Sequence, residues 1–155
     1  MKRTLFLWAW IMAGALSLSV TGQDKDPETF EKESRYDLET TVEKIRDAAS
    51  ESGWVLPGDH DMQATLKKGG KDVLPSTIIV LCNGKYAYPL LSQDETRKVQ
   101  TLLPCRVAVY EKADGNTYVA WSNYQSKGKK FGKEAGEVLK EISVGLKEIT
   151  SVVTQ

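Results

Sequence analysis

Hydrophobic and polar residues form two patterns in the middle of this chain, a continuous apolar run and a regular alternation, and both predict β-strands. The stretch STIIVLCN, positions 76–83, is consecutively apolar from Ile78 to Leu81 and rich in β-branched residues, which is typical of a central strand covered on both faces. Positions 105–123 alternate instead, and Asp114-Gly115 supplies turn residues midway. That second stretch predicts a β-hairpin.

Two other segments place their apolar residues at helical spacing. The first begins after Asp37, a suitable N-cap, ends at Gly53, and carries a stripe made of Leu38, Val42, Ile45 and Ala49. The second lies near the C-terminus, and its stripe consists of Ala135, Val138, Leu139, Ile142, Leu146 and Ile149. Mixed charges occupy its other side, so we expect this helix to pack on a core rather than on a membrane.

The remaining segments predict shorter elements. Positions 30–36 predict a charge-rich edge strand, and positions 54–62 predict an extended segment that Pro57-Gly58 interrupts. Positions 63–70 have room for one or two helical turns before a pair of glycines.

The connection at positions 85–103 predicts helical pieces between the apolar strand and the hairpin. Pro89 limits the first piece, and Asp94 can cap the second. Strands and helices in this order predict an α+β fold, in which a mainly antiparallel sheet carries helices packed on one face.

The N-terminal end has the three-part layout of a secretory signal. Lys2 and Arg3 form a positive start, an apolar run follows, and small residues lead to Gly22, after which we expect cleavage. An uncleaved membrane anchor is the alternative, but the apolar run is slightly short for a span of about 20 residues. The sequence therefore predicts a secreted or periplasmic protein.

The predicted organisation is a signal peptide over 1–22, a flexible leader over 23–29 and one domain over 30–155. After cleavage the chain keeps 19 basic and 21 acidic side chains. This balance argues against nucleic-acid binding, which needs a concentrated basic surface. The densest basic run, KGKKFGK at 127–133, is more typical of a solvated loop than of a phosphate or anionic-lipid site. We expect no stable membrane association after cleavage.

Residue types that carry catalysis or bind cofactors are scarce. The sequence has no glycine-rich phosphate loop after a strand, no Cys-x-x-Cys and no pair of histidines at metal spacing. His60 is the single histidine, so a zinc site would need both cysteines and a carboxylate beside it. A catalytic triad would likewise need His60 as its base. We predict neither a metal nor a cofactor.

The two cysteines, Cys82 and Cys105, end the apolar strand and begin the hairpin, respectively. If these strands pair antiparallel, the end of the first lies beside the start of the second. Side-chain alternation groups Cys82 with Ile78 and Cys105 with Val107, and both sets could point into one core. Oxidising compartments allow an even number of cysteines to pair, so we expect a disulfide between them. Two reduced, buried cysteines are the alternative.

Five stretches together resemble the domain of unknown function 302 family: DMQATLKKGGKDVLP, IIVLCNGKYAYPLL, LLPCRVAVYE, DGNTYVAWSN and GKKFGKEAGEVL. Their most specific parts are Cys-Asn after an apolar strand and Leu-Pro-Cys-Arg leading into the hairpin. The family usually has proline after Cys-Asn, where this chain has Gly84, which loosens the turn. The resemblance implies a compact α+β fold, often associated as a dimer, and no established activity.

The sequence favours a small exported binding or accessory module without catalysis of its own. We expect a pocket for a small ligand where strand ends meet loops, near Cys82, Asn83, Tyr86, Cys105 and Arg106. Arg106 offers a forked donor for a carboxylate. A second copy of the chain, docked through a sheet edge or the last helix, is a further expected partner.

The alternative is a thiol-based redox protein or enzyme that uses Cys82 or Cys105. A reactive cysteine needs a lowered pKa, which a nearby cation or a helix N-terminus provides. Arg106 follows Cys105 directly, and a helix after Asn83 would place its positive end near Cys82.

Overall fold

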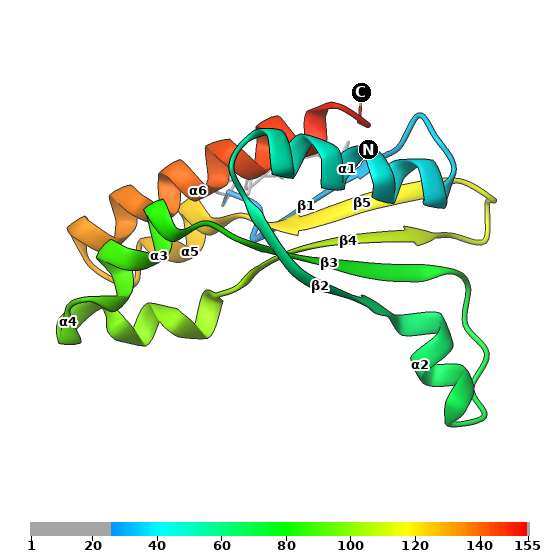
Figure 1. Ribbon diagram of the computed structural model, residues 1–155, viewed down its shortest axis with the longest axis horizontal. Helices are drawn as coiled ribbons and strands as arrows, with labels where there is room; N and C mark the ends of the chain where they lie inside the picture. The colour runs from blue at the N-terminus through cyan, green and yellow to red at the C-terminus, as the bar shows by residue number, and fades with distance from the viewer. Residues whose placement is uncertain (1–25, 155) are drawn as a thin grey trace, which may run out of the picture.

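Residues 26–154 are described by the computed structural model, and their strands form one antiparallel sheet of five strands (Figure 1). The strands are β1 (Thr29–Glu33), β2 (Val55–Asp61), β3 (Ser76–Cys82), β4 (Cys105–Glu111) and β5 (Thr117–Ser122). Their spatial order is β1-β5-β4-β3-β2, so β1 and β2 form the edges. The signal peptide predicted for positions 1–22 lies outside the described residues.

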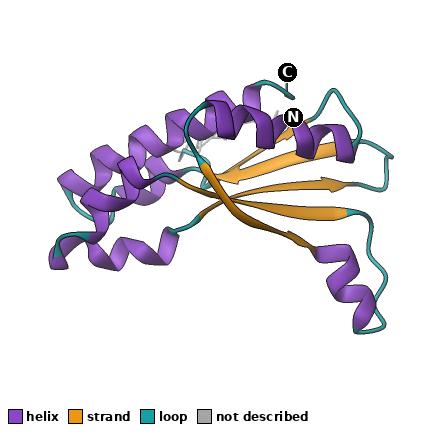
Figure 2. Ribbon diagram, in the orientation of Figure 1, coloured by secondary structure: helices purple, strands orange, loops and turns teal. Residues whose placement is uncertain are grey.

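The two long helices, α1 (Leu38–Glu51) and α6 (Lys133–Ser151), lie over the same face of the sheet, as Figures 1 and 2 show. The shorter helices are α2 (Met62–Lys68), α3 (Gly84–Leu91), α4 (Asp94–Arg97), the 3-10 helix η1 (Lys98–Leu102) and α5 (Tyr124–Gly128). The predicted α+β class and the antiparallel sheet are therefore confirmed. Within residues 26–154, no helix is both long and apolar enough to cross a membrane.

Local backbone chemistry explains where α1 begins and ends. The Oδ1 atom of Asp37 accepts the backbone N–H of Thr40 at 2.8 Å, which satisfies a donor that the first turn leaves free. After the helix the chain turns at Gly53, whose φ of 74° lies in the left-handed region that favours glycine. Both predicted ends of this helix are confirmed.

Helix α6 buries the stripe that its sequence predicts and packs closely on α5. Five residues of the stripe are almost fully buried: Ala135, Leu139, Ile142, Leu146 and Ile149. The close approach depends on Gly128 of α5, where an added Cβ would lie 3.1 Å from the Cβ of Leu139. Helix α5 itself was not predicted from the sequence pattern.

The two faces of the sheet differ in how well they are covered. Beneath the long helices, Val107 of β4 lies opposite Ile79 of β3, and both side chains are fully buried. On the other face Val80 is buried, but Ile78 is only half-buried. β3 is an interior strand, as predicted, because it pairs with β2 on one side and β4 on the other. The predicted cover on both of its faces is only partial, since Ile78 is half-buried.

The connection after β3 differs from the prediction at two residues. Helix α3 continues through Pro89 to Leu91, although proline cannot donate to the carbonyl four residues earlier. That carbonyl belongs to Lys85, an exposed residue of the first turn, where water can replace the missing donor. Asp94 is the first residue of α4, and Gln93 takes the N-cap position without a side-chain hydrogen bond.

Candidate functional site

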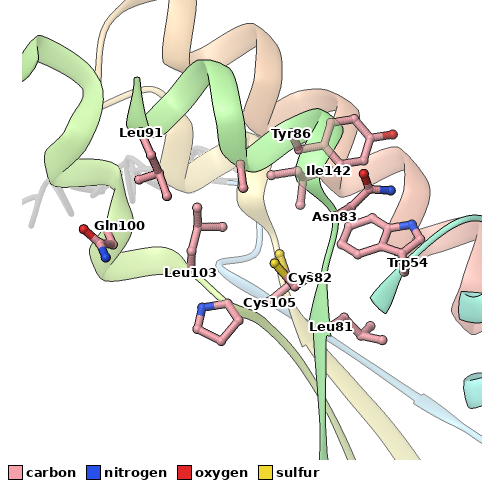
Figure 3. Close-up of a pocket in the computed structure, with 12 residues that line it drawn as sticks. Trp54, Leu81, Cys82, Asn83, Tyr86, Leu91, Gln100, Leu103, Cys105 and Ile142 are labelled. Carbon is pink, nitrogen blue, oxygen red and sulfur yellow. The ribbon is translucent and has the colours of Figure 1, made fainter. Parts of the chain in front are cut away.

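A cavity of about 190 Å³ lies where β3 ends, α3 begins and β4 starts (Figure 3). We call it the thiol cavity, because both cysteines line it. Its walls consist of Trp54, Leu81, Cys82, Asn83, Tyr86, Ala87, Leu91, Gln100, Leu103, Pro104, Cys105 and Ile142. Most of these side chains are apolar or aromatic, so the cavity suits an apolar molecule better than a charged one.

The Cys-Asn-Gly stretch converts a strand directly into a helix. Cys82 ends β3, and the Oδ1 atom of Asn83 then accepts the backbone N–H of Lys85 at 3.0 Å, which caps α3. Gly84 is the first helical residue, and a Cβ added there would meet nothing within 4 Å. Proline is favoured at this first helical position, so the family's usual proline and Gly84 are compatible with the same turn. The hydrogen bond from the Lys85 N–H to Asn83 fixes the turn between β3 and α3 even without a proline.

Aromatic rings form one wall of the thiol cavity. The rings of Trp54 and Tyr86 lie 5.5 Å apart between centroids and are tilted by 45°. Trp54 fits against α6 because Gly145 has no side chain: an added Cβ would lie 3.2 Å from the Cζ2 atom of the indole. In Figure 3 this aromatic wall faces Leu91 and Leu103, with the two cysteines between them.

Cys105 is a core residue as well as a cavity residue. It is 2% exposed, and burial raises the pKa of its thiol to about 11. A hydrogen bond with the hydroxyl of Tyr124 opposes this rise only in part. The thiol is therefore protonated at neutral pH, and Arg106, despite its place in the sequence, does not turn it into a nucleophile.

The predicted disulfide is absent, and Cys82 and Cys105 are both free thiols. The strands do pair antiparallel, but Leu81 rather than Cys82 lies opposite Cys105. Side chains alternate along a strand, so Leu81 shares the helix-covered face with Cys105, and Cys82 follows the opposite alternation. The expectation that Cys82 and Cys105 both point into one core is therefore wrong, because the register differs from the expected one by one residue.

Four of the five residues predicted for a pocket line the thiol cavity: Cys82, Asn83, Tyr86 and Cys105. Arg106 does not, because it alternates with Cys105 along β4 and is exposed. Trp54 and Ile142 were not predicted at this site, because they arrive from distant segments. Only the pairing of β2 with β3 and the docking of α6 bring them to the cavity.

The single histidine lies away from this cavity. His60 is exposed on the edge strand β2, opposite Ile78 of β3. Within residues 26–154, no three side chains of histidine, cysteine, aspartate or glutamate are grouped so that they could hold a metal ion. Two lysines of the basic run already have partners: the Nζ atom of Lys127 donates to the hydroxyl of Ser122 at 2.9 Å, and Lys129 forms an ion pair with Asp26 at 2.8 Å.

Comparison with known proteins places this geometry in a family. The family model described as "Domain of unknown function DUF302" matches residues 30–151. The solved structure of an uncharacterized conserved protein DUF302 from Bacillus stearothermophilus is similar, with a TM-score of 0.73 and 20% identity over 80% of this chain and 96% of that chain. No curated protein matches the chain. Since the family model spans most of the sequence, the chain belongs to the DUF302 family of domains of unknown function.

Proposed function

We propose that this protein is a small exported binding or accessory domain whose thiol cavity holds a small, largely apolar molecule. The observation that carries the proposal is a cavity of about 190 Å³ walled mainly by apolar and aromatic side chains. A protein cavity of about 150 Å³ with aliphatic and aromatic walls is large enough to bind benzene. Ligand sites typically combine such walls with a few polar groups that fix orientation.

The polar groups of the cavity favour a flat ring that carries a hydrogen-bond acceptor. Asn83 uses its Oδ1 atom to cap α3, which leaves its amide N–H groups to donate to a ligand. Trp54 and Tyr86 offer ring faces and edges, against which an aromatic ligand packs in an offset or edge-to-face geometry. A small aromatic ketone such as acetophenone has both features.

A test of this proposal is a titration of the purified protein with acetophenone, followed by thermal unfolding. We expect the ligand to raise the unfolding temperature, because binding to the native state alone stabilises it. Replacing Ala87 in the cavity wall by leucine should remove that rise by filling the space. Ala64→Leu on the exposed surface of α2 is the matched control and should keep it. A rise that survives Ala87→Leu would place the ligand elsewhere.

A thiol-based function at Cys82 is the second candidate. Cys82 directly precedes Asn83, the N-cap of α3, and its free, half-buried thiol lines the cavity, where a small reactant can meet it. Labelling with iodoacetamide at neutral pH separates the two candidates. A Cys82 that reacts faster than free cysteine would support thiol chemistry, and a slower one would remove it.

Export is part of the proposal and rests on the N-terminal sequence pattern. The intact mass of protein recovered from the periplasm or the medium should correspond to a chain that lacks residues 1–22. A recovered chain that retains them would remove the cleavable signal from the proposal.

A further inference from the structure

A second and larger groove runs between the edge strand β1 and helix α6, with a volume of about 590 Å³. We call it the α6 groove. It shares no lining residue with the thiol cavity. Its size falls within the range of about 300–1,000 Å³ that small-molecule sites in proteins occupy.

An indole in the wall of this groove lacks a hydrogen-bond acceptor. Trp121 is 4% exposed, and its buried Nε1–H has no partner within residues 26–154. Buried N–H groups in proteins nearly always have an acceptor, so a molecule from outside is the natural source of one. The ring centroids of Trp121 and Phe30 are 5.5 Å apart, and Phe30 lies on β1, an edge strand that is paired on one side only. Both rings line the α6 groove.

The side chains of the α6 groove offer more donors than acceptors. Lys147 has no ion-pair partner among the described residues, and the hydroxyl of Ser143 lies in the same wall. The carboxylate of Asp26 is already paired with Lys129 at 2.8 Å, so its charge is compensated. A surplus of donors beside an unpaired ammonium group favours an anion with acceptor oxygens.

The shape and the apolar part of the groove indicate what that anion is attached to. Ser143, Lys147 and Ser151 lie on successive turns of α6, so the groove follows the helix for roughly 12 Å at about 1.5 Å per residue. Val144 is 50% exposed beside Phe30, which gives the groove an apolar surface. We propose that the α6 groove binds an aliphatic carboxylate, whose head group accepts hydrogen bonds from these donors while its chain covers Phe30 and Val144.

The test is calorimetric titration of the protein with octanoate and with 1-octanol, which has the same chain without the carboxylate. We expect octanoate to bind at least about tenfold more tightly than octanol, because only octanoate satisfies the ammonium group. Val144→Glu should weaken octanoate by about tenfold or more through charge repulsion. Val152→Glu, on an exposed valine outside the groove, is the matched control and should bind as the parent does.

Lys147→Gln provides a second variant that adds no charge to the groove, and it should also weaken octanoate but not octanol. Ala87→Leu fills the thiol cavity and should leave octanoate binding unchanged, which separates this site from the proposed function. The inference is overturned if octanoate does not bind or binds no better than octanol. It is equally overturned if Val144→Glu binds like the parent, or if Ala87→Leu abolishes octanoate binding.

Discussion

At the level of single residues, the two cysteines differ in what surrounds their sulfur atoms. Cys105 begins β4 beneath the helices, is 2% exposed, and shares a hydrogen bond with the hydroxyl of Tyr124. Cys82 lies one position beyond Leu81, the partner of Cys105 across the strands, and stays half-buried at the cavity. A difference of one residue in strand register therefore leaves Cys105 in the core and Cys82 at the start of α3.

The raised pKa of Cys105 predicts slow labelling and a definite dependence on pH. In a Cys82→Ser variant, Cys105 should react with iodoacetamide far more slowly than free cysteine at pH 8, because it ionises only near its pKa of about 11. Ionisation favours the unfolded chain, so the thiol lowers the free energy of unfolding only as pH rises from about 9 toward 11. Labelling at the rate of free cysteine at pH 8 would contradict the burial of the Cys105 thiol.

At the level of elements, the two glycines at the contact of α5 with α6 differ in how much space a side chain would find. A Cβ on Gly128 would lie 3.1 Å from the Cβ of Leu139 and 3.3 Å from the Cα of Gly136. A Cβ on Gly136 would have its nearest neighbour at 3.7 Å, an ordinary contact. A methyl group would therefore push the two helices apart at Gly128 but not at Gly136.

Gly128→Ala should lower the free energy of unfolding by about 1–3 kcal/mol, the usual cost of overpacking a buried contact. Gly136→Ala should be neutral or raise it by up to about 1 kcal/mol, because alanine has the higher helix propensity. Urea unfolding of both variants checks this pair. Equal effects from the two substitutions would mean that α5 does not approach α6 through Gly128.

Elements with a strong local pattern could be predicted from the sequence, and those that depend on neighbours could not. The stripe of α6 and the Asp37 cap of α1 follow from spacing and from a single side chain. Helix α5 is five residues long and depends on Asn123, whose Oδ1 atom accepts the N–H of Ser126, and on contact with α6. The passage of α3 through Pro89 likewise depends on the exposure of Lys85, which a sequence pattern does not record.

At the level of the whole molecule, the candidate site joins segments that are far apart in the chain. Asn83 and Cys105 were predicted to lie near each other because the end of one antiparallel strand lies beside the start of the next, and both do line the thiol cavity. Trp54 and Ile142 reach it only through tertiary packing. The face on which Arg106 lies depends on strand register, and a shift of one residue exchanges faces.

A crystal structure of the protein grown with acetophenone shows whether the thiol cavity accepts a small aromatic molecule. We expect electron density for the ring between Trp54 and Cys105, with the ketone oxygen within hydrogen-bond distance of the Asn83 amide. A cavity that holds only water or protein side chains in such crystals, or acetophenone bound elsewhere on the molecule, would contradict this expectation.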